Sequence, residues 1–381
     1  QIAEGRSVPD DAAIESLAPR CASAQRGVIV AGPAPASQAQ ARAAVAQLVR
    51  ASGFALLAEA SSQLRFTGTA DDALIDAADW LYQSPAADAE WLPDVVIQLG
   101  APPTSGAWER LLDRHPEIER TVIAPTGWPD PHNSAQHLIR ADIGAACERL
   151  AGAVARLRAE SAPGEFTRTL AAANARARVA IAAQTQGDDL TEGAVAQTVA
   201  ARLPRHAWLA LGNSLPIRTV DEYCAATLAD VRVLSQRGAS GIDGLISGAA
   251  GAASVADDPV ALLVGDISTL HDIGGLALGA LVRVPLVLVV INNGGGRIFE
   301  QLPVARAAGA ASMRHFTTPH AADFEHAARL YGHAFARVRT RGALAAALDQ
   351  ALAQRGCTLI EAVVPPSGAA EERARILAAL Q

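Results

Sequence analysis

The sequence is poor in cysteine, in clustered positive charge and in long uninterrupted apolar runs. The 32 basic and 39 acidic residues give a net charge of −7 without any basic run, which argues against a nucleic-acid partner. The longest apolar stretch, residues 276–291, is interrupted by Arg283 and Pro285 and is too short to predict a membrane span. The scattered cysteines include no Cys-x-x-Cys pair, which argues against a zinc site and a disulfide framework and favours buried free thiols. They are Cys21, Cys147, Cys224 and Cys357.

Aromatic residues and methionine are also scarce, with seven Phe, three Tyr and one Met, so Ala, Val, Leu and Ile must supply the cores. Half of the chain is apolar and 19% is charged, and 381 residues give room for two domains. No signal peptide opens the chain, and we expect a cytoplasmic protein. Because the first residue is Gln1 rather than Met, we also expect that the chain has been processed or truncated.

Strand-like and helical segments alternate along the chain, which predicts an α/β protein with two doubly wound parallel sheets. In the first block the expected strands are residues 27–32, 54–57, 95–99 and 121–124, with helices at 37–51 and 143–159. In the second block the expected helices are 166–183 and 192–202, the latter capped by Thr191, and the expected strands are 207–211, 261–264, 286–291 and 358–364. The expected boundaries are 1–24 for a linker or remnant of a preceding domain, 25–162 for one domain and 163–381 for the other.

Two loops at predicted strand ends carry the strongest chemical signal. Asp266 follows one buried strand and Asn293 follows the next, and residues 273–281 between them are long enough for one crossover helix. The two loops should therefore meet at one edge of a parallel sheet. A carboxylate, an amide oxygen and the backbone carbonyl of Gly295 are oxygen ligands suited to Mg²⁺, and Ser268 lies at a helix start that favours phosphate. The pattern indicates a metal-bridged diphosphate, although a turn with an Asx cap is the alternative.

These residues and three further segments resemble one enzyme family. Gly265-Asp266 followed by Asn292-Asn293 is similar to the metal motif of thiamine-diphosphate (ThDP) enzymes, with Ile267 where many members have a second glycine. Residues 212–218 (GNSLPIR), 237–244 (RGASGIDG) and 298–303 (IFEQLP) resemble, in that order, the MenD family of 2-succinyl-5-enolpyruvyl-6-hydroxy-3-cyclohexene-1-carboxylate synthases of menaquinone biosynthesis. The specific similarity covers residues 211–303.

The resemblance implies a Rossmann-like central domain over 25–162 and a ThDP-fold domain over 163–381 that binds the diphosphate and Mg²⁺ or Mn²⁺. It implies a transferase that decarboxylates 2-oxoglutarate and adds the resulting succinic semialdehyde carbanion to isochorismate, in a homodimer or dimer of dimers. The implied metal ligands are Asp266, Asn293 and Gly295. The implied cofactor-binding residues are Gly212, Asn213, Ser240, Gly241, Ile242, Gly265, Ile267 and Ser268. The implied catalytic residues are Ser214, Arg218, Arg237, Ile298, Phe299 and Leu302.

The resemblance gives these residues different tasks, and each has a simpler alternative. Arg218 and Arg237 would bind substrate carboxylates through their planar forks, whereas a lone arginine usually forms a surface salt bridge. Ile242 would support the bent cofactor, or simply fill a core position. Residues 298–302 would form an apolar wall, or the buried face of a short helix. For His271 and Asp272, next to the metal motif, we expect a structural or capping role.

The sequence departs from the family in two places. No segment matches the N-terminal domain whose glutamate activates the cofactor, so the chain alone is expected to be inactive, through truncation or because another polypeptide supplies the domain. The basic pair that follows Thr-Ser in some members is replaced here by Gly106-Ala107, and Arg110 is a speculative substitute. Another ThDP-dependent 2-oxoacid decarboxylase or acetohydroxyacid synthase and a catalytically silent cofactor-binding module remain alternatives. A dinucleotide-binding protein is the weakest, because Gly32-Pro33-Ala34 does not extend into a Gly-x-Gly-x-x-Gly motif.

Overall fold

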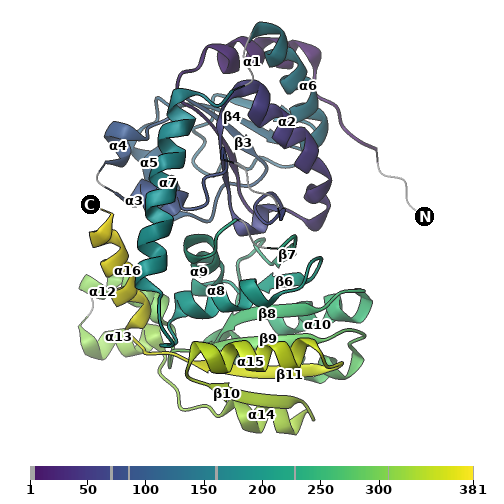
Figure 1. Ribbon diagram of the computed structural model, residues 1–381, viewed down its shortest axis with the longest axis vertical. Coiled ribbons are helices and arrows are strands. Elements are labelled where there is room, and N and C mark those ends of the chain that lie inside the picture. The colour runs from purple at the N-terminus through teal and green to yellow at the C-terminus, as the bar shows by residue number, and fades with distance from the viewer. Residues whose placement is uncertain are drawn as a thin grey trace. The chain divides into compact units, whose positions relative to one another are not determined.

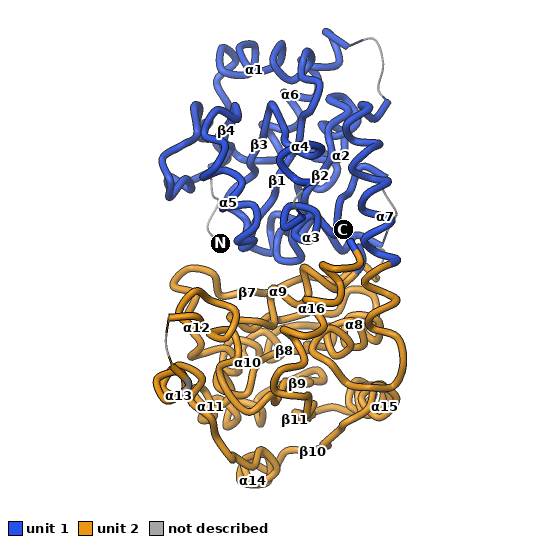
Figure 2. Tube along the Cα trace, turned by 90° about the vertical axis from the view of Figure 1, so that its left-hand side faces the viewer, with its two compact units in different colours: residues 1–179, 225–227, 380–381 blue, residues 180–224, 228–379 orange. Residues whose placement is uncertain are grey.

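The structure is a computed structural model that describes residues 5–68, 72–84, 86–158, 162–226, 229–307 and 309–380. The chain divides into two compact units (Figure 2). Unit 1 contains Gln1–Val179, Ala225–Thr227 and Leu380–Gln381, and unit 2 contains Ala180–Cys224 and Leu228–Ala379. Each unit is built on one parallel sheet, so the predicted α/β class is confirmed (Figure 1).

The sheet of unit 1 has five parallel strands in the order β2-β1-β3-β4-β5. Their bounds are β1 (Gly27–Ala31), β2 (Ala55–Ala58), β3 (Val95–Leu99), β4 (Glu119–Ala124) and β5 (His137–Arg140). Alternate residues such as Ile29, Ile97 and Ile123 pack against α1 (Asp11–Ser23), α2 (Arg42–Ser52) and α6 (Ile143–Leu157). In Figure 1, α3 (Ala78–Gln83), α5 (Gly106–Arg114) and α7 (Glu165–Gln184) lie on the other side of this sheet. The remaining helices are η1 (Ala36–Ala41), η2 (Ala60–Ser62) and α4 (Ala87–Glu90).

Helix α1 lies within residues 1–24, which the sequence led us to expect as a linker or the remnant of a preceding domain. Its residues Ile14, Leu17, Ala18 and Cys21 are buried in the core of unit 1 against α6. Pro19 lies inside the helix, and a proline in that position argues against a helix when only the sequence is read. The apolar spacing of i, i+3, i+4 and i+7 outweighs it, because that stripe faces the core.

Glu59, directly after β2, closes the carboxyl edge of this sheet. Its Oε1 accepts hydrogen bonds from the backbone N–H groups of Thr104, at 2.5 Å, and Ser105, at 3.1 Å. The Ser105 hydroxyl caps α5 by accepting from Trp108 N at 3.1 Å. A side-chain carboxylate therefore holds the backbone N–H groups of the two residues that directly precede α5.

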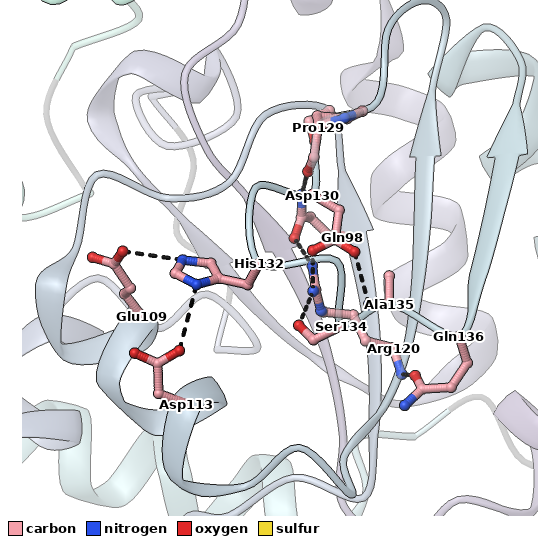
Figure 3. Close-up of polar contacts among 11 residues, drawn as sticks. Gln98, Glu109, Asp113, Arg120, Pro129, Asp130, His132, Ser134, Ala135 and Gln136 are labelled. Carbon is pink, nitrogen blue, oxygen red and sulfur yellow. Dashed lines mark hydrogen bonds and ion pairs between the residues drawn. The ribbon is translucent and has the colours of Figure 1, made fainter.

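A buried ion pair fixes the loop after β4 (Figure 3). Arg120 on β4 donates to Asp130 Oδ1 at 2.6 Å, and both side chains are 3% exposed. Arg120 also donates to Gln98 Oε1 at 2.8 Å and to Ser134 Oγ at 2.7 Å. Burial opposes ionisation of Asp130, but hydrogen bonds from Ala135 N and Arg120 and the arginine charge outweigh it and hold the pKa of Asp130 below its usual value.

The sheet of unit 2 has six parallel strands in the order β10-β11-β9-β8-β6-β7. Their bounds are β6 (Trp208–Leu211), β7 (Arg232–Ser235), β8 (Val260–Gly265), β9 (Leu286–Asn292), β10 (Ala334–Val338) and β11 (Cys357–Val363). One face packs against α10 (Leu245–Val255), η3 (Ile273–Leu281) and α14 (Phe324–Leu330). Contacts to β8 and β9 from α8 (Glu192–Arg202), α9 (Leu215–Tyr223) and α15 (Arg341–Leu352) complete the helical cover. The remaining helices are α11 (Asp266–His271), η4 (Arg297–Gln301), α12 (Val304–Ala307), α13 (Ala310–Thr317) and α16 (Gly368–Ala379).

The crossover between β8 and β9 consists of α11 followed by the 3₁₀ helix η3, and the two strands are adjacent and parallel as predicted. Three glycines in nine residues of η3 disfavour a regular α-helix. Two of them allow close packing, since a Cβ at Gly275 would lie 2.7 Å from Ser247 Oγ and one at Gly279 would lie 2.6 Å from the His333 ring.

All four cysteines are buried free thiols. Among the described residues, no helix combines the length and the apolar character needed to cross a membrane.

Candidate functional site

The predicted site residues lie in the segments that follow four strands at one edge of the unit 2 sheet. Each of the strands β9, β8, β6 and β7 runs in the same direction, so the loops that follow them are neighbours. Residues 293–296 follow β9, Asp266 follows β8, residues 212–214 follow β6, and residues 236–244 follow β7. Loops that lie far apart in the sequence are therefore brought together by the sheet.

Asp266 is buried and lies one residue beyond the last paired residues of β8 and β9, Gly265 and Ile291. Its Oδ1 accepts from Ile267 N at 2.7 Å, and its Oδ2 accepts from Gly295 N at 2.9 Å. His320 Nε2 lies 3.2 Å from the same Oδ2. The His320 ring accepts from Ala322 N at Nδ1, and among the described residues its Nε2 has no hydrogen-bond partner.

Asn293 is also buried, with 6% of its surface exposed. Its Nδ2 donates to Glu192 Oε1 at 2.7 Å, across 101 residues of sequence. Among the described residues, its Oδ1 has no hydrogen-bond partner. A buried carbonyl-type oxygen without a donor is costly, and a metal ion supplies such a contact.

The charges around Asn293 favour a cation as well. Burial, with a contribution from the charges of Asp266 and Glu372, raises the pKa of the Glu192 carboxyl to about 7, although the hydrogen bond from Asn293 acts in the opposite direction. The described part of the chain contains no group of three or more His, Cys, Asp and Glu side chains that could hold a metal. A metal at this edge would therefore depend on the mixed oxygen set of a carboxylate, an amide and a backbone carbonyl, which suits Mg²⁺.

The glycine loop after β9 fits closely against its surroundings. Gly295 has φ +146°, and a Cβ at this position would lie 2.4 Å from the Thr317 carbonyl oxygen. The Gly295 carbonyl accepts from Arg297 N at 2.9 Å, which uses one of its two lone pairs. The position therefore requires glycine, and its carbonyl oxygen retains a lone pair for a further contact.

Asn213 joins the loops after β6 and β7. Its Nδ2 donates to the carbonyl oxygens of Gln236, at 3.1 Å, and Gly241, at 2.6 Å, and its Oδ1 accepts from Arg237 NH1 at 2.7 Å. Gly212 lies beside β8, where a Cβ would be 3.0 Å from the Leu263 carbonyl oxygen. The predicted cofactor residues Gly212, Asn213 and Gly241 are thus part of one hydrogen-bonded pair of loops.

Two serines in these loops have left-handed backbones, Ser214 with φ +73° and ψ −131° and Ser240 with φ +55°. Such conformations are unfavourable for residues other than glycine and are concentrated at functional sites. Arg218, on α9, donates from NH1 to the Ser214 carbonyl at 2.8 Å. Arg218 forms no ion pair with any carboxylate in the described ranges, so the salt-bridge alternative does not apply there.

The predicted apolar residues are only partly shielded. Ile298 and Phe299 lie half-buried on η4, which contains no buried residue, and Leu302 is 43% exposed. The Phe299 ring packs against Phe316 with centroids 5.8 Å apart. Ile242 is half-buried in the loop after β7. These side chains are neither core residues nor fully solvated, so they are available to line a ligand.

The residues next to the metal motif have structural contacts. Asp272 accepts from Ser247 N at 2.8 Å and from Ser247 Oγ at 3.0 Å in the first turn of α10, which is a structural role as predicted, although its side chain does not cap η3, the helix that follows it. His271 is exposed. Ser268 is buried, and Gly265 accepts from the Thr269 hydroxyl at 2.9 Å.

Sequence reasoning missed Glu192, His320 and Glu361 as parts of this site. Glu192 was predicted only as the first residue of a helix capped by Thr191, which the structure confirms. Glu361, on β11, accepts from Asn292 Nδ2 at 2.7 Å and from Arg337 Nε at 2.7 Å. The signal that was available is a Glu within the apolar run of β11, because a charged residue in a buried strand needs a partner.

Comparison with protein families gives two matches. Residues 14–211 match the family described as "Middle domain of thiamine pyrophosphate", and residues 226–362 match "Thiamine pyrophosphate enzyme, C-terminal TPP binding domain". The second match contains the loops of Asp266, Asn293 and residues 236–244.

Curated relatives with similar sequences carry one name. The 2-succinyl-5-enolpyruvyl-6-hydroxy-3-cyclohexene-1-carboxylate synthase of Sorangium cellulosum is 44% identical over 99% of this chain and 63% of its own length. The synthases of the same name from Geobacillus kaustophilus and Rubrobacter xylanophilus are 37% and 36% identical, over 87% and 95% of this chain and 56% and 62% of their own lengths. The chain thus spans less than two thirds of the curated relatives that it matches.

One solved structure shares the fold. An X-ray structure titled as a putative thiamin diphosphate-dependent enzyme from Mycobacterium smegmatis superposes with a TM-score of 0.68. The match covers 96% of this chain and 66% of the other, at 18% sequence identity.

Proposed function

Because the chain belongs to the family of thiamine pyrophosphate enzymes, we propose that it carries the cofactor-binding part of a synthase that decarboxylates 2-oxoglutarate and adds the remaining four-carbon unit to isochorismate. The curated relatives that bear this synthase name support the substrates. The observation that carries the proposal is the arrangement at the unit 2 sheet edge, where Asp266 and Asn293 follow β8 and β9, Arg218 lies on α9 after the adjacent β6, and Arg237 follows β7.

The residues present fit a ThDP–Mg²⁺ group. Asp266, the Asn293 amide oxygen and the Gly295 carbonyl would hold the metal, and the metal would bind the cofactor's diphosphate. Asn293 Oδ1 is buried without a donor, and Gly295 leaves no space for a side chain, so the chain provides both a ligand atom and close backbone access. When bound, ThDP supplies the electron sink for decarboxylation and carbon–carbon bond formation.

The remaining residues bind and orient substrates. Arg218 and Arg237 would hold carboxylate groups, since a guanidinium binds a carboxylate through two parallel hydrogen bonds and stays charged. The strained Ser214 fixes the direction of the first turn of α9 and accepts through its carbonyl from Arg218. Ile298, Phe299 and Leu302 would exclude water from the reacting atoms, and Ile242 would support the cofactor rings.

Assembly and location belong to the same proposal. The resemblance to the synthases supports a homodimer or dimer of dimers. Four buried free thiols fit a reducing compartment such as the cytoplasm.

The metal site is tested by Asp266→Ala. Isothermal titration of the chain with ThDP should show Mg²⁺-dependent binding that the substitution abolishes, because the diphosphate then lacks its bridging cation. Asp257→Ala is the matched control, since this exposed aspartate lies just before β8 while Asp266 lies just after it. Unchanged ThDP affinity in the Asp266 variant would contradict the assignment.

The reaction is tested by following isochorismate consumption with ThDP, Mg²⁺ and 2-oxoglutarate. One sample contains the chain alone. The other also contains the part of the Sorangium cellulosum synthase that this chain does not match. Turnover that depends on both 2-oxoglutarate and isochorismate supports the proposed reaction. ThDP binding without isochorismate consumption in either sample would contradict the substrate assignment.

A further inference from the structure

We propose that Glu192 is a positioning residue for the metal site, which it serves by orienting the amide of Asn293. The inference rests on the proposed metal site and adds a residue from a different helix, α8, to it. Glu192 lies 101 residues before Asn293 in the sequence, and its Oε1 accepts a hydrogen bond from Asn293 Nδ2 at 2.7 Å.

The chemistry of the contact determines which end of the amide faces the site. An asparagine side chain has one donor end and one acceptor end, and the donor end of Asn293, Nδ2, faces Glu192 Oε1. The contact to Glu192 Oε1 therefore fixes the rotation of the Asn293 amide, with Nδ2 toward Glu192 and Oδ1 away from it. Only Oδ1 can coordinate a metal, so without this contact the amide could present its NH₂ group to the cation instead.

The neighbouring asparagine shows a purely structural version of the same contact. Asn292 donates from Nδ2 to Glu361 at 2.7 Å, but its Oδ1 accepts from Gly294 N at 3.1 Å, so both ends of this amide are used within the protein. Glu361 is also paired with Arg337. Asn293 differs because its oxygen is buried and has no partner among the described residues.

Glu192 itself lacks a cation partner. In the part of the chain that the structure describes, it forms no ion pair with Arg or His, and the nearby charged groups are the carboxylates of Asp266 and Glu372. A dication bound at Asn293 would lie close to these carboxyl groups and would favour their ionised forms.

The test measures Mn²⁺ binding to the folded chain by EPR titration, with and without ThDP, alongside thermal unfolding of the metal-free protein. Loss of an outer contact to a metal ligand typically weakens metal binding by about 10- to 100-fold. We expect this loss for Glu192→Ala. We expect a smaller loss for Glu192→Gln, because the glutamine oxygen can still accept from Asn293 but its NH₂ can equally face Oδ1.

The double variant Glu192→Gln with Asn293→Asp separates orientation from charge. It keeps the net charge and the hydrogen bond, with the introduced glutamine amide now donating, and either oxygen of the new carboxylate can face the metal. We expect Mn²⁺ affinity within about threefold of the wild type, tighter than in the Glu192→Gln single variant. This comparison remains informative if Glu192→Ala fails to fold.

Glu361→Gln is the control for a structural role. It replaces a glutamate that, like Glu192, accepts from an asparagine Nδ2. We expect this variant to have lower thermal stability, with Mn²⁺ affinity within about threefold of the wild type. Glu192→Ala with wild-type Mn²⁺ affinity, or a double variant that binds no tighter than Glu192→Gln, would overturn the inference. If Asp266→Ala also leaves Mn²⁺ binding unchanged, it is the metal site that fails rather than the role of Glu192.

Discussion

Replacing Asp130 by Asn removes the charge that pairs with Arg120 while keeping the shape of the side chain. Arg120 would retain two neutral acceptors, Gln98 Oε1 and Ser134 Oγ, and Ala135 N could still bond to the amide oxygen. Loss of a charge-assisted hydrogen bond costs about 1.5–3 kcal/mol. Because a guanidinium that is 3% exposed is also left without its counter-charge, the expected total is about 3–5 kcal/mol.

Urea and thermal unfolding at pH 7 measure this change. For a unit of this size the loss corresponds to a melting temperature lower by roughly 6–20 °C. Glu109→Gln is the control, because Glu109 contacts His132 at 3.0 Å in the same region but is 57% exposed (Figure 3). Exposed pairs contribute at most about 1 kcal/mol.

The pH dependence gives a second check on Asp130. Its pKa is lower in the folded protein than in the unfolded chain, so its contribution to stability is complete above about pH 4 and is lost as the pH falls through the folded pKa. The stability difference between the wild type and Asp130→Asn should therefore shrink on acidification. A difference below about 1 kcal/mol at pH 7, or one that does not change between about pH 7 and pH 3, would refute the reasoning.

Two further substitutions test the site and its support. In the reaction that contains the added part of the Sorangium cellulosum synthase, Arg218→Ala should lower kcat/KM for 2-oxoglutarate by about 30-fold or more, since a charge-assisted bond contributes about 2–4 kcal/mol. Arg218→Lys should lower kcat/KM less. ThDP binding should be unchanged in both variants. Equal kcat/KM in the wild type and the alanine variant would argue against a substrate contact. Asp272→Ala should reduce the free energy of unfolding by about 0.5–2 kcal/mol in urea titrations, because Ser247 loses its cap, and Asp272→Asn, which keeps an acceptor, should reduce it much less.

The interior strands of both sheets could be predicted from the sequence, but three edge strands could not. Strands β1, β8 and β9 consist almost entirely of apolar residues because both faces of a central parallel strand are buried. Strands β5, β7 and β10 lie at sheet edges and contain exposed residues. Since one side of an edge strand faces no neighbouring strand, its sequence carries little apolar signal.

The predicted metal ligands are found together because each lies at the end of a recognisable strand. Glu192, whose carboxylate accepts a hydrogen bond from Asn293, could not be found in this way. Glu192 begins a helix, where an exposed acidic residue is ordinary, and only its contact with a loop 101 residues away gives it another role. Such contacts depend on how α8 packs against the sheet, which local sequence does not specify.

The hydrogen bonds of Asn213 have a consequence for binding thermodynamics. One side chain holds the loops after β6 and β7 through two donated bonds and one accepted bond. The conformational entropy of these loops is therefore lost when the chain folds, and not when a ligand arrives. A preorganised pair of loops leaves more of the contact energy for affinity, so their order raises the binding constant without adding a single contact to the ligand.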